Sequence, residues 1–170
     1  MIIVTSYENP DTDGCGGALA YAELLRAQGK DAEARFFAAP SLEAQYIFTQ
    51  LKEIKLIPFS ATLDDEIVLV DASESPYLHF LPTFEKVMEV IDHRKINDVE
   101  TFKNAKVQIE LVGAADTLVT ERFVQAKITP SPEVALFMYS GIVSNTLNFQ
   151  SPNHTERDVK MAEWLKAAVY

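Results

Sequence analysis

The segment YENPDTDGCGGALAYAELL (Tyr7–Leu25) decides how this chain folds. It follows the apolar run Ile2–Val4, which has the length and composition of a short buried strand. Apolar residues then recur at helical spacing over roughly residues 14–28. Two aspartates, Asp11 and Asp13, and three glycines lie where the strand gives way to the helix. The segment therefore predicts a strand, an acidic turn and a helix, and raises the question whether that turn holds a metal ion.

The same alternation of apolar runs and helical patterns continues along the chain. Ile67–Val70 is a nearly continuous β-branched run, typical of a strand buried on both faces of a sheet. The alternation indicates an α/β fold with a doubly wound, mainly parallel five-stranded sheet and helices on both faces. Further strands are expected near 34–37, 87–91 and 107–112, and further helices near 42–51, 115–125, 133–143 and after Thr155.

Composition and charge restrict the class of protein. With 48% hydrophobic residues and 24% charged residues, the 170-residue chain has the composition of a soluble globular domain. The net charge of -10 argues against binding nucleic acid beyond short oligonucleotides, because such binding needs a basic surface. The single cysteine, Cys15, fits a reducing compartment, and no segment has the length of a membrane span. These features predict a cytoplasmic protein.

Acidic residues follow three of the expected strands. Asp11 and Asp13 come after the first strand, Asp71 follows Ile67–Val70, and Asp92 and His93 follow the strand near 87–91. The carboxyl ends of parallel strands share one edge of the sheet, so these side chains are expected to lie close together. Their mutual repulsion would be relieved by a divalent cation, and oxygen and nitrogen donors favour Mn²⁺ or Mg²⁺. The alternative is that each aspartate only caps a helix or forms a turn.

The segment Val112–Thr117 places Gly113 in a turn that opens a helix. Free N–H groups at such a turn could bind a phosphate. An ordinary strand-to-helix turn has the same pattern, however, and Asp116 could itself satisfy the helix N-terminus. From the residues alone, both readings stay open.

In this order, the motifs resemble those of the DHH phosphoesterase superfamily, and in particular the N-terminal domain of the manganese-dependent (family II) inorganic pyrophosphatases. The resemblance covers nearly the whole chain. It rests on NPDTDG (9–14), VLVDASE (68–74), VIDHRK (90–95), LVGAADTLV (111–119) and SGIVSNTLNFQSP (140–152).

The resemblance implies a site with two metal ions. By position, Asp11, Asp13, Asp71 and His93 match metal ligands of the family, and Asp71 would bridge the two ions. Asp92 matches an aspartate that orients the catalytic site. The resemblance further implies a homodimer formed through a sheet edge. It also implies a second, substrate-closing domain, which is absent from residues 1–170, so that the chain is expected to be a single DHH-type catalytic domain.

Three positions depart from the family pattern. Tyr7 stands where the pyrophosphatases have a histidine, and Arg94 stands where they have a second histidine near the substrate. Arg94 could bind a phosphate with two hydrogen bonds, but it is a poor proton donor. Asn145 replaces a ligand aspartate and offers only an uncharged amide oxygen, a weaker ligand. Weaker and incomplete metal loading is therefore expected, with one or two Mn²⁺ or Mg²⁺ ions.

Two functions follow as expectations. The first is a divalent-metal-dependent phosphohydrolase, similar to a pyrophosphatase, in which water attacks a phosphoanhydride or phosphodiester. Asp92 and Arg94 would be its catalytic residues, and Arg94 and Gly113 would bind the small phosphorylated substrate. The second is a catalytically degenerate DHH domain that binds a metal or phosphorylated ligand, or that serves as an interaction module.

Overall fold

A computed structural model describes residues 1–169 of the chain. Five strands form one sheet in the order β2-β1-β3-β4-β5, and every neighbouring pair is parallel. This confirms the expected parallel α/β fold. The strands are β1 (Ile2–Thr5), β2 (Ala32–Ala34), β3 (Glu66–Val70), β4 (Val87–Asp92) and β5 (Lys106–Ile109).

The chain order of the strands reverses at β1, which lies between β2 and β3. Ile2 and Val4 of β1 are paired with Ala32 and Ala34 on one side, and β3 is paired on the other. In open parallel sheets, ligands bind outside the carboxyl ends of the strands next to such a reversal. The segments that follow β1, β3 and β4 all leave the sheet at that edge.

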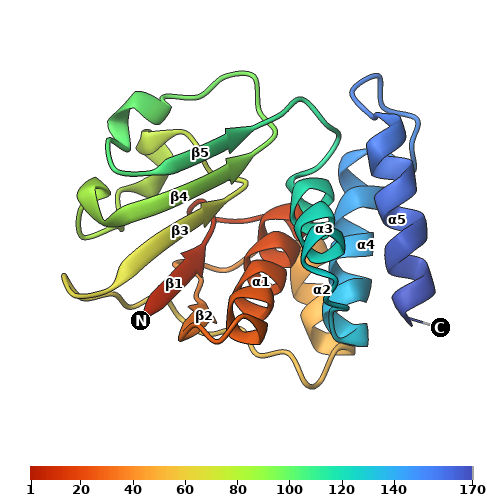
Figure 1. Cartoon of the computed structure of the whole chain (residues 1–170), viewed down its shortest axis with the longest axis horizontal. Helices are drawn as coiled ribbons and strands as arrows, with labels where there is room; N and C mark the ends of the chain where they lie inside the picture. The colour runs from red at the N-terminus through yellow and green to blue at the C-terminus, as the bar shows by residue number, and fades with distance from the viewer. Residues whose placement is uncertain (170) are drawn as a thin grey trace.

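The α-helices gather on one face of the sheet, as Figure 1 shows. Val4 of β1 and Val68 of β3 face this layer and pack in one apolar core with Leu24, Leu118 and Met138. Burial of these side chains supplies most of the driving force for the fold. The helices are α1 (Thr12–Ala27), α2 (Leu42–Gln50), α3 (Ala115–Ala126), α4 (Pro132–Asn145) and α5 (Glu156–Val169).

The opposite face is covered by three short 3₁₀ helices and their loops. Ile67 and Leu69 alternate with the residues that face the α-helices, and they pack against Leu78 and Phe102 in a second core. Helices therefore do cover both faces, but those on this face are one turn long. They are η1 (Ser75–Leu78), η2 (Phe84–Lys86) and η3 (Val99–Thr101).

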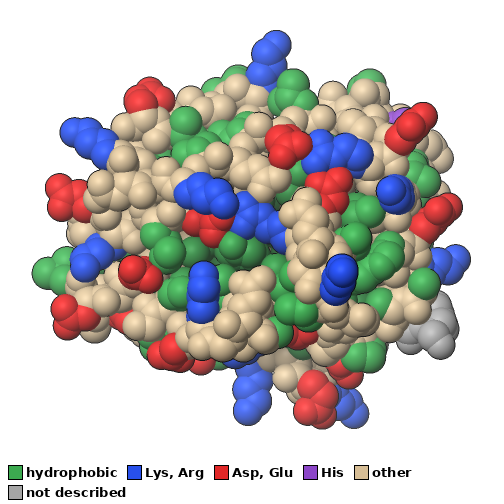
Figure 2. Space-filling model, in the orientation of Figure 1, with side chains coloured by type: hydrophobic (Ala, Val, Ile, Leu, Met, Phe, Trp, Pro, Cys, Tyr) green, Lys and Arg blue, Asp and Glu red, His purple; other side chains and the backbone are tan. Residues whose placement is uncertain are grey.

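The element boundaries follow the sequence pattern closely, with two shifts. β2 ends at Ala34, two residues before Phe36, which instead forms an isolated bridge with Pro58. β5 ends at Ile109, short of the expected Val112. Within residues 1–169, no helix combines the length and the apolar character needed to cross a bilayer. On the face shown in Figure 2, Lys and Arg side chains are interspersed with Asp and Glu.

Candidate metal centre

The acidic turn after β1 is built by the first turn of α1. Asp11 is the N-cap of this helix, and its Oδ1 atom accepts the Gly14 N–H at 3.0 Å. The glycines let α1 lie directly on the sheet, because a Cβ at Gly17 would stand 2.5 Å from Val70 Cγ1. Asp13 is thereby carried inward and is fully buried.

The Asp13 carboxylate is held by the N-terminus of α3, which packs beside α1. Its two oxygens accept the N–H groups of Ala115 and Asp116 at 2.8 and 2.7 Å, at the N-terminus of α3. A helix N-terminus favours a negative charge in this position. The Asn145 amide also donates to Asp13 Oδ2, at 2.7 Å. In this orientation Asn145 presents N–H rather than oxygen to Asp13, so its role as a weak metal ligand stays a prediction.

Asp71 follows β3 and has a left-handed backbone, with φ at +56°. This conformation costs a non-glycine residue roughly 1 kcal/mol or more and is typically retained at functional sites. The side chain is buried, and its Oδ1 atom has no hydrogen-bond partner among the described residues. A buried carboxylate oxygen without a partner is energetically costly and indicates that a cation belongs beside it.

His93 completes the group. Its Nδ1 atom lies 3.0 Å from the Val112 carbonyl, which can only accept, so Nδ1 carries the proton. Nε2 faces two carboxylates, lying 3.5 Å from Asp13 Oδ2 and 3.4 Å from Asp71 Oδ1. One ligand atom from each of the three residues falls within 4.8 Å of the others. This donor set fits a divalent cation, with the Val112 contact fixing the imidazole as metal-binding histidines require.

The electrostatics agree with this assignment. Burial, together with the nearby Asp71 charge, raises the pKa of Asp13 well above its usual range. Burial lowers the pKa of His93, but the nearby carboxylates of Asp71 and Asp13 outweigh it and raise that pKa to about 10, so that Nε2 also carries a proton when no metal ion is bound. The pocket between the carboxylates therefore favours positive charge, which a metal ion would provide.

Arg94 and Tyr7 occupy the side of Asp71 that faces away from His93. The Arg94 guanidinium lies 3.3 Å from Asp71 Oδ2 and 4.9 Å above the Tyr7 ring. The Tyr7 hydroxyl accepts the Asp11 N–H at 2.9 Å. Burial and the charges of Asp11 and Asp71 raise the pKa of Tyr7 well above its ordinary value. Tyr7 is therefore a neutral support beneath Arg94.

Asp92 makes contacts that suit the orienting position expected for it, whereas Gly113 departs from its expectation. Asp92 is buried, and its Oδ1 atom accepts the N–H groups of His93 and Arg94 at 2.6 and 3.2 Å, so it is a positioning residue. The Gly113 N–H is donated to both oxygens of Asp158, at 3.0 and 2.9 Å. This corrects the expectation that the Gly113 turn presents a free N–H to phosphate.

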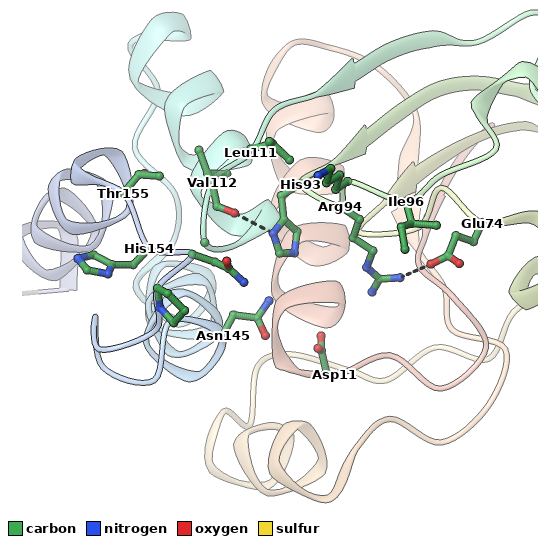
Figure 3. A pocket seen from close by; sticks show the side chains of 14 residues that line it. Asp11, Glu74, His93, Arg94, Ile96, Leu111, Val112, Asn145, His154 and Thr155 are labelled. Atoms are coloured by element: carbon green, nitrogen blue, oxygen red, sulfur yellow. Dashed lines mark hydrogen bonds and ion pairs between the residues drawn. The ribbon is translucent and has the colours of Figure 1, made fainter.

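A cavity of about 820 Å³ adjoins the centre at His93, while Asp13 and Asp71 lie buried behind it. Figure 3 shows the side chains of Asp11, His93, Arg94 and Asn145 converging on it. The sequence did not predict that the loop before α5 would line this cavity. His154 lies in that loop, but no neighbouring motif indicated a role for it. Other lining residues are Glu74, Lys95, Ile96, Leu111, Pro152, Asn153 and Thr155.

Two buried aspartates and a partly buried histidine at the carboxyl edge of a parallel α/β sheet fit an α/β protein that binds a divalent metal ion. The family model described as "DHH family, N-terminal domain" matches residues 1–142. The chain therefore belongs to the DHH family.

Relatives and solved structures agree with this membership. A "probable manganese-dependent inorganic pyrophosphatase" of Enterococcus faecalis is 31% identical over 166 residues, covering 96% of this chain and 54% of the relative. The protein of the same name from Deinococcus radiodurans is 33% identical, covering 93% and 51%. The chain thus spans about half the length of these curated relatives.

Two solved structures share the fold. One, from Methanococcus jannaschii and assigned to the family II inorganic pyrophosphatases, has a TM-score of 0.80 and 25% identity, covering 99% of this chain and 56% of that one. An exopolyphosphatase-related protein from Bacteroides fragilis has a TM-score of 0.78 at 16% identity, covering 99% and 53%. The second likeness concerns the fold alone.

Proposed function

We propose that residues 1–170 form a DHH-type domain that hydrolyses small phosphorylated substrates with the help of a divalent metal ion. The observation that carries this proposal is the group of Asp13, Asp71 and His93, whose atoms have the spacing of metal ligands and whose histidine lines an open cavity. Manganese is the ion to test first, because the relatives are named manganese-dependent. When bound, such an ion supplies a Lewis acid that activates water and offsets phosphoryl charge.

Residues of the chain would bind the ion, position the site and hold the substrate. Asp13, Asp71 and His93 would hold the ion, and Asp92 would keep the backbone of His93 and Arg94 in place through its two hydrogen bonds. Arg94 lines the cavity, and the N–H groups of its guanidinium that do not face Asp71 or Glu74 would hold a phosphoryl oxygen.

The absence of a proton donor at Arg94 favours one class of substrate. Burial lowers the pKa of Arg94, but the nearby carboxylates outweigh it and keep the pKa above its ordinary value, so the guanidinium does not donate a proton. A phosphate leaving group needs less proton donation than an alkoxide does. Phosphoanhydrides such as pyrophosphate and short polyphosphates are therefore proposed ahead of phosphodiesters.

Turnover tests the proposal directly. Protein reconstituted with Mn²⁺ or Mg²⁺ is assayed on pyrophosphate, tripolyphosphate, bis-nitrophenyl phosphate and a dinucleotide. Release of phosphate from an anhydride is expected, with loss of at least 100-fold in Asp71→Asn and no change in Asp64→Ala, an exposed aspartate outside the site. If metallated protein turns over none of these compounds, the proposal is overturned.

The alternative is a domain that binds a metal or phosphorylated ligand without turnover. It is favoured by the ion pair of Arg94 with Asp71 and by the amide that Asn145 turns toward Asp13. Binding of a non-hydrolysable imidodiphosphate, measured by calorimetry on protein that lacks turnover, would identify it. A homodimer through the β5 edge and a cytoplasmic location stay predictions from the sequence.

A further inference from the structure

The two oxygens of the Asp71 carboxylate have neighbours of different kinds. Oδ1 lies 3.4 Å from Nε2 of His93, on the side where Asp13 completes the ligand group. Oδ2 lies 3.3 Å from Nη2 of Arg94. A carboxylate that bridges two ions presents one oxygen to each ion, and paired ions lie about 4 Å apart. Here a guanidinium stands on the side where a second ion would be bridged.

Arg94 is fixed in this position from several directions. Its Nη1 atom lies 3.7 Å from Glu74 Oε1, and its guanidinium stacks 4.9 Å above the Tyr7 ring. Its backbone N–H donates to Asp92 Oδ1 at 3.2 Å, and this hydrogen bond fixes the backbone from which the side chain extends toward Asp71. Only 28% of the Arg94 side chain is exposed, so the charge sits inside the site rather than in bulk solvent.

Tyr7 and Asp11, on the Arg94 side of Asp71, each already have a hydrogen-bond partner. Tyr7 turns the face of its ring toward the cation, and its hydroxyl accepts the Asp11 N–H at 2.9 Å. The Asp11 Oδ1 atom caps α1 through Gly14. Among residues 1–169, the group with metal-ligand spacing is Asp13, Asp71 and His93, which accounts for one ion.

We propose that the Arg94 guanidinium permanently replaces one of two cations, so that the centre binds a single divalent ion at Asp13, Asp71 and His93. This inference rests on the proposed function, since it defines the metal content of the same site. A second divalent ion beside Asp71 would be repelled by the fixed positive charge unless Arg94 moved away. Metal activation would accordingly follow a single-site binding curve.

Metal stoichiometry tests the inference without reference to activity. The full chain is reconstituted with excess Mn²⁺, freed of loose ions by gel filtration and analysed by elemental mass spectrometry and frozen-solution electron paramagnetic resonance. One ion per chain with the spectrum of isolated Mn²⁺ is expected. Two ions per chain, a spin-coupled pair or no retained ion would each overturn the inference.

A gain of metal provides the sharper test. Tyr7→His combined with Arg94→Ala removes the cation and restores a nitrogen donor, so the stoichiometry is expected to rise from one to two. Arg94→Lys, which keeps a positive charge, and Lys95→Ala, which removes an exposed charge one residue away, are expected to retain one ion. A folded double variant that still binds one ion would contradict the inference.

A second variant covers the case in which the double variant does not fold. Arg94→Gln keeps much of the side-chain length but removes the charge, and calorimetric titration with Mn²⁺ is expected to show a second, weaker binding event. If the titration shows one event as in the unmodified chain, the guanidinium is not what excludes the second ion.

The outcomes separate this inference from the proposed function. One bound ion without turnover of any anhydride overturns the function and leaves the single-ion centre standing. Two bound ions with turnover overturn the single-ion centre and leave the function standing.

Discussion

Asp158, in the first turn of α5, joins three segments through one buried carboxylate. It accepts the Gly113 N–H at 3.0 and 2.9 Å and the Thr117 hydroxyl at 2.6 Å. It also accepts the N–H and the hydroxyl of Thr155, at 2.6 and 2.7 Å, as in a helix capping box. The substitution Asp158→Ala would remove the partner of all these donors together.

The cost follows from which donors cannot find another partner. The hydroxyls of Thr117 and Thr155 can rotate, but the backbone N–H groups of Gly113 and Thr155 cannot. The buried Gly113 N–H left unsatisfied costs about 1–3 kcal/mol, and loss of the capping bond to the part-buried Thr155 N–H adds about 1 kcal/mol. We therefore expect Asp158→Ala to lower the free energy of unfolding by about 2–4 kcal/mol. Asp158→Asn keeps one acceptor oxygen and should cost about half as much.

Urea unfolding followed by far-UV circular dichroism measures these differences. The exposed Asp64 provides a matched control, because Asp64→Ala should change the free energy of unfolding by less than about 0.5 kcal/mol. The m-value should stay the same in all variants if the denatured state is unchanged. A loss below about 1 kcal/mol for Asp158→Ala would refute the assignment of Asp158 as the common acceptor.

Further substitutions test the centre and its surroundings. Asp71→Ala should abolish the retention of Mn²⁺, measured by elemental analysis. Asp71→Asn should also abolish it, with a smaller loss of stability, because asparagine tolerates the positive φ at this position better than alanine does. Unchanged metal content in either variant would contradict the assignment of Asp71 as a ligand. Gly141→Ala would place a Cβ 2.0 Å from Asp116 Oδ2 and 3.0 Å from the Asp13 Cα, so urea unfolding should show a loss of about 1–3 kcal/mol or more, and native stability would contradict this close packing. Asp116→Ala removes a buried carboxylate whose oxygens lack hydrogen-bond partners among residues 1–169. The free energy of unfolding should therefore rise by about 1 kcal/mol in the same assay. A decrease would show that the Asp116 carboxylate makes a stabilising contact.

The elements could be predicted because their signals are local. A few neighbouring residues are enough to predict each element. Examples are the glycines near the start of α1, the apolar run that forms β3 and the serine that caps α2. Ser41, for example, accepts the N–H of Ala44, three residues along the chain, at 3.2 Å. The parallel order then brings the residues after β1, β3 and β4 to one edge, which is why Asp13, Asp71 and His93 could be grouped before their geometry was known.

The contacts that decide the site's chemistry are not local, and the sequence does not show them. Gly113 reads as a phosphate-binding turn until its N–H is seen to be donated to Asp158, 45 residues later. Arg94 reads as a free phosphate ligand until its guanidinium is placed between Asp71 and the Tyr7 ring. In both cases the side chain or N–H has a competing partner that only the tertiary structure identifies.

The hydrogen bonds from α3 to Asp13 have a consequence for folding during synthesis. Both Asp13 oxygens accept N–H groups from residues 102 and 103 positions further along the chain. During synthesis, the first strand and helix therefore emerge long before the partners that orient this carboxylate. We therefore expect the proposed metal site to be complete only after α3 has docked against α1, so that an ion would bind after these elements have folded.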